Sequence, residues 1–233
     1  GAPGAAVVRA RVHSPDPHSV STLMRILMTG ATGLVGQGVL REVLAHPALT
    51  RVGLLGRRAS GCDDPRAEDL VVERFDALDA VADRLAPWDA CFYCAGAPPL
   101  GTPQARYRHV TVDLTLHVAR EFARCNPEGR FLYVSGAHAD PTSRLMPLRI
   151  KGEIEAALQT LPITSVMLRP GGIQPVHGER SPHAWMRPMY ALGGPFMGLG
   201  VRMMPGVMTT TGAVGRALLS LARMADPPSV VEN

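Results

Sequence analysis

The sequence predicts an α/β fold built on a doubly wound parallel sheet, and three observations support this. Short apolar segments alternate with stretches of helical periodicity along most of the 233 residues. A glycine-rich turn follows the first apolar segment, and an amphipathic stretch follows that turn. Hydrophobic residues make up 46% of the chain, which suits one globular domain with a sizeable core. We therefore expect one domain over residues 24–233, with substrate-binding elements mainly in 171–210, preceded by a disordered tail over 1–23.

The expected strands are the apolar segments, and the expected helices lie between them. The strands are expected at 25–29, 51–55, 71–74, 90–94, 130–134, 163–168 and 229–231. The helices are expected at 34–45, 78–85, 107–124, 148–160 and 211–224, the last capped by Thr210 or Thr211. Because crossovers between parallel strands are right-handed, this alternation places helices on both faces of the sheet.

The turn at residues 30–36 reads Gly-Ala-Thr-Gly-Leu-Val-Gly. Backbone N–H groups at a helix N-terminus attract anions, and missing side chains let a dinucleotide pyrophosphate come close. The alternative is a structural turn whose glycines only let a helix pack on a strand. The strand before and the helix after favour the cofactor, making this a Rossmann-type site. The expected cofactor contacts are Gly30, Thr32, Gly33, Leu34, Val35 and Gly36.

The end of the second expected strand indicates which dinucleotide binds. A carboxylate about 20 positions after the glycine turn usually binds the ribose hydroxyls of NAD. This chain instead has Arg57 and Arg58, which can pair with a 2′-phosphate. We therefore expect NADP(H), with NADPH preferred over NADH; the alternative is that both arginines are ordinary solvated loop residues. Asp76 is expected either to meet the adenine amine or to cap a helix.

The chain contains a single lysine, Lys151, among its 24 basic residues. A lysine is a compact donor whose pKa can be tuned, whereas an arginine is always charged and planar. Lys151 follows Ser135, the residue after the fifth expected strand, by sixteen positions. Both are expected at the carboxyl edge of the sheet, near the nicotinamide end of the cofactor.

Taken together, these segments resemble the short-chain dehydrogenase/reductase superfamily. The likeness is to its atypical branch near the nucleoside-diphosphate-sugar epimerases and the Tat-interacting-protein-like oxidoreductases. The matching segments are 29–36, 94–96, 134–140, 151–155 and 168–171. The resemblance implies that Ser135 polarises a substrate carbonyl and that Lys151 binds the nicotinamide ribose. It also implies further cofactor contacts at Cys94, Ala95, Gly96, Pro170, Gly171 and Ile173.

The chain departs from that family at the usual proton donor, a tyrosine four residues before the lysine. That position holds Pro147, which is tolerated only in the first turn of a helix. The favoured substitute is His138, three residues after Ser135, although a solvated loop histidine is the alternative. Tyr107 and Tyr190 are weaker candidates.

We expect an NADP(H)-binding oxidoreductase that reduces a small carbonyl compound with a non-standard proton donor. The alternative is a non-catalytic NADP(H)-binding redox sensor that reports to a protein partner, a role that the loss of the tyrosine favours. A small-molecule substrate is the expected partner, and homodimerisation is left open. The segment 174–208, with His177, His183, Trp185 and Tyr190, is expected to line the substrate site.

Charge, cysteine content and one apolar segment argue against nucleic-acid binding, a metal site and a membrane span. The formal charge of +4 comes from arginines scattered among acids, so nucleic acid is not an expected partner. Cys91 and Cys94 have the spacing of a metal or redox motif, but they lie in an apolar run. We expect them to be core cysteines in a reducing cytoplasm, with no metal. Met189–Met208 is apolar, but its prolines and Arg202 favour a flap or a partner-binding surface over a membrane span.

Overall fold

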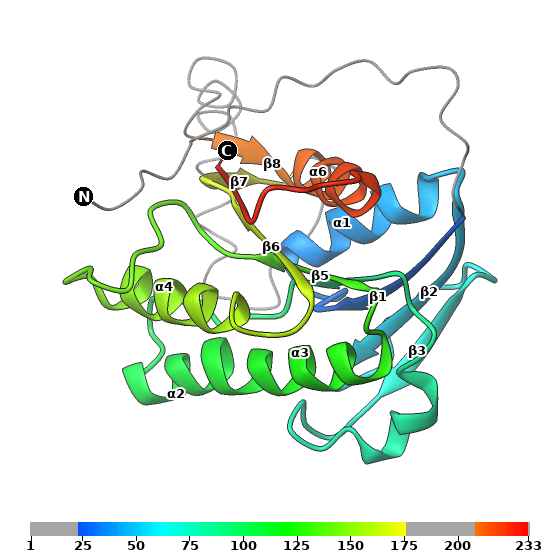
Figure 1. Ribbon diagram of the computed structural model, residues 1–233, viewed down its shortest axis with the longest axis horizontal. Helices are drawn as coiled ribbons and strands as arrows, with labels where there is room; N and C mark the ends of the chain where they lie inside the picture. Colours follow the sequence, from blue (N-terminus) through cyan, green and yellow to red (C-terminus); the bar gives the residue numbers. More distant parts are fainter. Residues whose placement is uncertain (1–22, 176–207, 233) are drawn as a thin grey trace.

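The computed structural model describes residues 23–175 and 208–232, and they form a sheet of seven parallel strands in the order β3-β2-β1-β4-β5-β6-β9 (Figure 1). The chain winds outward from β1 in one direction and from β4 in the other. The predicted doubly wound fold is thereby confirmed, with its switch point between β1 and β4. The strands are β1 (Met24–Thr29), β2 (Leu49–Gly56), β3 (Ala67–Val71), β4 (Ala90–Tyr93), β5 (Arg130–Val134), β6 (Thr164–Arg169) and β9 (Val230–Glu232).

Helices cover both faces of the sheet. Figure 1 shows α1 (Leu34–Ala45) and α6 (Thr211–Arg223) on one face, and α3 (Leu114–Cys125) and α4 (Met146–Leu158) on the other. Side chains of β1 alternate between the two cores: Ile26 and Met28 pack with the α1 side, and Leu27 packs with the α3 side. Each face of the sheet thus has its own apolar layer, as a buried parallel sheet requires.

A small second sheet lies apart from the main one, and it precedes the last helix. In it β7 (Gly172–Gln174) pairs in parallel with β8 (Met208–Thr210). Thr210 then caps α6, because its hydroxyl accepts a hydrogen bond of 3.1 Å from the amide of Ala213. Of the two predicted caps, Thr210 is the one the structure uses.

Several elements differ from the sequence-based expectation. The third strand is Ala67–Val71 rather than 71–74. It is an edge strand, so it tolerates charged residues such as Glu68, which pairs with Arg84 at 3.0 Å, and a search for apolar runs misses it. The helix expected at 78–85 is a six-residue 3₁₀ helix, η1 (Asp79–Arg84).

The helix expected at 107–124 begins earlier and is interrupted. It consists of α2 (Gln104–Arg108), one π-helical turn, η2 (His109–Asp113), and then α3. The helix expected at 148 begins two residues earlier, at Met146, with Pro147 in its first turn. Proline fits there because the first-turn N–H groups have no partner within the helix.

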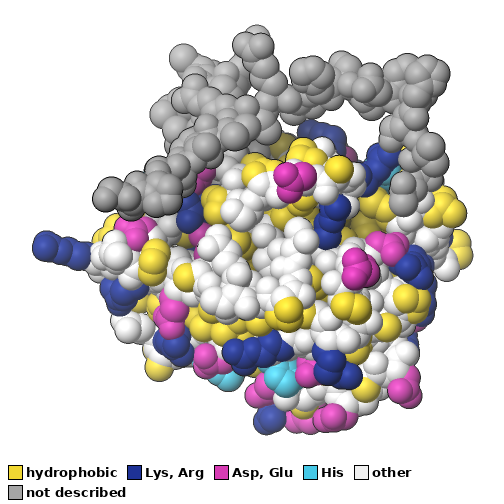
Figure 2. Space-filling model, in the orientation of Figure 1, with side chains coloured by type: hydrophobic (Ala, Val, Ile, Leu, Met, Phe, Trp, Pro, Cys, Tyr) yellow, Lys and Arg dark blue, Asp and Glu magenta, His cyan; other side chains and the backbone are white. Residues whose placement is uncertain are grey.

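The surface mixes charges of both signs. On the face drawn in Figure 2, arginine and acidic side chains are interspersed over the helices. Within residues 23–175 and 208–232, no helix is long and apolar enough to cross a bilayer. The expected flap Met189–Met208, apart from Met208, lies outside the described residues, as do His177, His183, Trp185 and Tyr190.

Candidate cofactor-binding site

The glycine turn between β1 and α1 is shaped so that side chains would not fit. Gly30 has a φ of +72°, and a Cβ there would lie 2.6 Å from the backbone nitrogen of Ala95. A Cβ on Gly36 would lie 1.9 Å from the carbonyl oxygen of Gly30. The backbone of α1 therefore sits directly on the turn, and the turn sits directly on the segment after β4.

The N-terminus of α1 faces this turn with free backbone donors. The amide of Gly33, the N-cap residue, donates to the carbonyl of Gly30 at 2.9 Å. The next amides, those of Leu34, Val35 and Gly36, belong to the first helical turn, which has no intrahelical acceptor for them. Thr32 is exposed, and its carbonyl accepts from the Gln37 side chain at 3.0 Å. A cradle that a Cβ would fill, beside the positive end of a helix, fits a pyrophosphate.

A cleft of about 150 Å³ lies beside the switch point, at the carboxyl ends of β4 and β5. It brings together seven of the residues expected from the sequence: Val35, Cys94, Ala95, Gly96, Ser135, Lys151 and Ile173. The structure adds five residues that the sequence did not single out for this cleft: Ala97, Tyr107 (considered only as a proton donor), Thr111, Tyr133 and Val134. Residues from the segment after β4, from β5, from α4 and from the α2–η2 segment thus converge on one pocket.

Ser135 is positioned by the end of β5 and carries an unused hydroxyl. Its amide donates to the carbonyl of Leu168 at 2.8 Å, which continues the pairing of β5 with β6. Only 6% of the residue is exposed, and within the described residues its Oγ has no hydrogen-bond partner. A buried polar atom without a partner costs free energy. This hydroxyl is therefore suited to a ligand that fills the cleft.

Lys151 enters the cleft from α4. Its side chain passes Gly136, where a Cβ would lie 3.3 Å from the lysine Cδ. Its Nζ stands 5.5 Å from the ring centroid of Tyr133, a cation–π arrangement. Burial lowers the pKa of Lys151 to about 8, although the negative charge of Glu155 opposes that shift.

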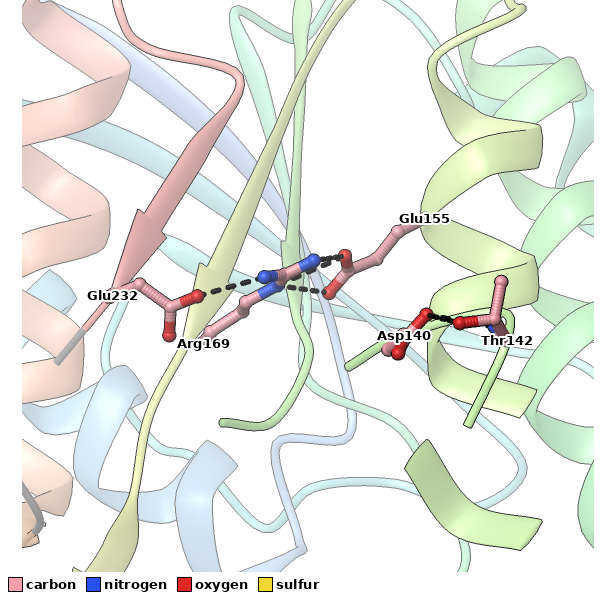
Figure 3. A network of polar contacts seen from close by, with 5 residues as sticks. All are labelled: Asp140, Thr142, Glu155, Arg169 and Glu232. Carbon is pink, nitrogen blue, oxygen red and sulfur yellow. Dashed lines mark hydrogen bonds and ion pairs between the residues drawn. The ribbon is translucent and has the colours of Figure 1, made fainter. Parts of the chain in front are cut away.

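Glu155 links α4 to the strands beside it through Arg169 (Figure 3). The Nε of Arg169 donates to both carboxylate oxygens of Glu155, at 3.0 and 3.1 Å. The same guanidinium donates to Glu232 of β9 at 2.8 Å. The Glu155 side chain is 5% exposed and that of Arg169 is 20% exposed. Glu155 therefore holds a buried negative charge one helical turn from Lys151.

The expected site residues His138, Pro170 and Gly171 do not line the cleft. His138 is exposed, has a φ of +61°, and is not among the residues that line the cleft. Pro170 is buried, and its carbonyl accepts from the amide of Ala137 at 3.0 Å. Gly171, half-buried, connects β6 to β7. Pro170 thereby supports the loop that follows Ser135.

Arg57 and Arg58 are exposed at the end of β2. Neither has a hydrogen bond or ion pair to another described side chain. Asp76 accepts a hydrogen bond of 2.9 Å from Arg74, and the N-cap of η1 is Leu78 rather than Asp76. Asp76 therefore does not cap a helix.

Cys91 is buried in the core, and the other three cysteines pack against the apolar layers while partly exposed. All four are free thiols, and burial raises the pKa of Cys94 to about 12 and that of Cys91 well above its ordinary value. A high pKa keeps a thiol protonated and unreactive. Among the described residues, no three potential ligands gather into a metal site.

Sequence reasoning missed Thr111 and Tyr133 as cleft residues. Tyr133 had a signal, because it lies two positions before Ser135 in β5 and therefore points to the same face of the sheet. Thr111 is one helical turn beyond Tyr107. Nothing in the local sequence shows that this turn faces α4.

Comparison with known proteins identifies the family of this chain. The model of the NAD dependent epimerase/dehydratase family matches residues 26–155. Protein HTATIP2 of Rattus norvegicus is 27% identical over 164 residues, covering 69% of this chain and 67% of that protein. The mitochondrial protein fmp52 of Emericella nidulans is 29% identical over 172 residues, covering 69% and 71%.

Solved structures share the fold at low sequence identity. The UDP-glucose 4-epimerase of Thermus thermophilus, in complex with NAD, has a TM-score of 0.66 at 15% identity, covering 90% of this chain and 78% of that one. The enzyme WbmG of Bordetella bronchiseptica, also in complex with NAD, has a TM-score of 0.65 at 15% identity, covering 93% and 74%. The family match spans more than half of the sequence and includes both the glycine turn and Lys151. The chain belongs to the NAD dependent epimerase/dehydratase family.

Proposed function

We propose that this protein is an NADP(H)-dependent oxidoreductase that reduces a small carbonyl compound in the described cleft. The observation that carries the proposal is the meeting of two groups in one pocket. These are the unpartnered, buried hydroxyl of Ser135 and the half-buried ammonium of Lys151. Both lie next to a glycine cradle that fits a pyrophosphate.

Each group has a task in that reaction. When bound, the nicotinamide cofactor supplies the hydride. The Ser135 hydroxyl donates a hydrogen bond to the carbonyl oxygen of the substrate, which draws electron density from the carbonyl carbon. The Lys151 ammonium holds the cofactor ribose, and its charge stabilises negative charge in the cleft. The surrounding residues Val35, Ala95 and Ile173 exclude water from the reacting groups.

The preference for NADP(H) rests on Arg57 and Arg58. Both guanidinium groups stand exposed at the end of β2, where a carboxylate would otherwise select NAD. Asp76 is proposed to lie near the adenine, since it follows β3 at the same edge of the sheet. Thr32 and Gly171 are proposed to contact the cofactor from the turns after β1 and β6.

The test is a titration with NADPH and with NADH, followed by nicotinamide fluorescence. The double variant Arg57→Ala/Arg58→Ala should lower the affinity for NADPH by roughly 10- to 150-fold more than the affinity for NADH. This ratio corresponds to about 1.5–3 kcal/mol, the contribution of a lost charged hydrogen bond. Arg120→Ala/Arg124→Ala removes the same charge from the exposed side of α3 and should leave the ratio unchanged. Equal losses for both cofactors would contradict the 2′-phosphate assignment.

A second function, a non-catalytic NADP(H)-binding sensor, is favoured by one observation. Pro147 stands in the first turn of α4, four residues before Lys151, and it has no proton to donate. Adding a panel of small aldehydes and ketones to the NADPH complex separates the two functions. Oxidation of NADPH supports the reductase, whereas tight binding without oxidation supports the sensor.

The expected location is a reducing compartment such as the cytoplasm, because all four cysteines are free thiols. The fmp52 relatives are named mitochondrial, which makes that organelle the other location to test. Cell fractionation with an antibody against the chain distinguishes the two locations.

A further inference from the structure

The reaction proposed above needs a proton for the carbonyl oxygen, and Pro147 cannot provide it. The side chains with an exchangeable proton that line the described cleft are Cys94, Tyr107, Thr111, Tyr133, Ser135 and Lys151. His138, the donor favoured by the sequence, is absent from this lining and exposed to solvent. The substitute is therefore to be sought among the cleft residues.

Tyr107 reaches the cleft from α2. It lies near the end of α2, is only 1% exposed, and lines the same pocket as Ser135 and Lys151. The chain continues into the π-helical turn η2, which widens the helix at Thr111. Thr111 also lines the cleft, one helical turn beyond Tyr107, and its hydroxyl lowers the pKa of the Tyr107 phenol.

Salt bridges connect the segment that contains Tyr107 to α4, the helix that contains Lys151. Arg108, the next residue, forms an ion pair with Glu153 of α4. It also pairs with Asp113 at the end of η2, at 3.1 Å. These contacts bridge the two helices on the outside, while Tyr107 and Lys151 face the cleft on the inside. The ion pairs of Arg108 thereby fix the position of the α2–η2 segment relative to α4.

We propose that Tyr107 is the proton donor of this protein, a role that rests on the reductase function proposed above. The overall reaction converts a carbonyl compound, NADPH and one proton into an alcohol and NADP⁺. The hydride enters at the carbonyl carbon, and the phenolic proton of Tyr107 passes to the carbonyl oxygen as the π bond breaks. The resulting phenolate accepts a hydrogen bond from Thr111 and takes a proton back from solvent.

The neighbouring groups are less suited to this role. The thiol of Cys94, with a pKa of about 12, is a weak hydrogen-bond donor. The ring of Tyr133 is covered by the Lys151 ammonium on one side and packs against Tyr93, at 6.0 Å between centroids. Burial raises the pKa of Tyr107 above its usual 10, and the nearby Thr111 hydroxyl partly offsets that shift, so the phenol keeps its proton at neutral pH.

The test compares Tyr107→Phe with Tyr93→Phe, which removes the same atom from a buried tyrosine outside the cleft. Tyr107→Phe should lower kcat for carbonyl reduction by roughly 10²- to 10⁴-fold, with NADPH affinity unchanged within about twofold. Tyr93→Phe should leave kcat unchanged. Thr111→Val should raise the pKa of the Tyr107 phenol, because it removes the hydroxyl that lowers that pKa.

A readout independent of turnover uses ¹³C-labelled tyrosine, of which the chain has four. The resonance missing in Tyr107→Phe should shift when NADPH binds, and that of Tyr93 should not. Wild-type turnover retained in Tyr107→Phe, or lost only in Tyr133→Phe, would overturn the assignment while the reductase function stands. NADPH binding without turnover of any carbonyl by the wild-type protein would overturn both.

Discussion

The ion pair between Glu155 and Arg169 is expected to contribute far more to stability than the one between Arg169 and Glu232. Glu155 and Arg169 are 5% and 20% exposed at their side chains, whereas Glu232 is 40% exposed. Removing one partner of a buried pair leaves an uncompensated charge and costs about 3–5 kcal/mol, whereas an exposed pair contributes about 0–1 kcal/mol. In Glu155→Gln the Arg169 guanidinium still pairs with Glu232. We therefore expect the loss in the free energy of unfolding to lie near the lower limit, at about 3 kcal/mol.

The same substitution also acts on Lys151, which loses the carboxylate that favours its protonated form. Both effects destabilise the folded state at neutral pH. Urea unfolding of Glu155→Gln and Glu232→Gln at pH 7, followed by tryptophan fluorescence, gives the two free energies of unfolding. Equal losses in both variants, or a loss below about 1 kcal/mol for Glu155→Gln, would refute the reasoning from burial. Replacing Glu155 and Arg169 together by Leu and Met should recover most of the loss.

Three further predictions address the site. Lys151→Met should raise the free energy of unfolding at pH 7 by up to about 3 kcal/mol, because the folded pKa of about 8 lies below the ordinary 10.5. That gain should persist below pH 8 and vanish as the pH rises toward 10.5, which unfolding curves at several pH values would show. Gly36→Ala should cost about 2 kcal/mol or more and abolish NADPH binding, since its Cβ meets backbone at 1.9 Å. Gly96→Ala, with nothing within 4 Å of its Cβ, should stay within about 0.5 kcal/mol in the same unfolding assay. Pro147→Tyr places a phenol one helical turn from Lys151 and should restore carbonyl reduction to Tyr107→Phe; no recovery in a kinetic assay would show that the cleft does not admit a donor from α4.

The elements that the sequence predicted well are those whose signal is local. The glycine turn, the strand before it and the helix after it are contiguous, so periodicity and glycine spacing identified them. Ser135 was identified because it directly follows β5, and Lys151 because it lies in the next helix, α4. Parallel topology brings both to the carboxyl edge of the sheet. The edge strand β3 was misplaced, because its charged residues are tolerated only where the sheet ends.

The amino-acid sequence alone was enough to predict the doubly wound sheet, the glycine cradle and the two polar groups at the carboxyl edge. The choice of His138 rested on closeness along the chain, but the backbone turns there with a φ of +61° and leaves the side chain in solvent. The packing of α2 and η2 against α4, not any local pattern, brought Tyr107 and Thr111 to the cleft. Likewise Arg169 meets Glu155 and Glu232 across 14 and 63 positions of sequence. Contacts of this kind depend on how helices and strands pack against one another. They leave no repeating pattern in the sequence, so periodicity cannot predict them.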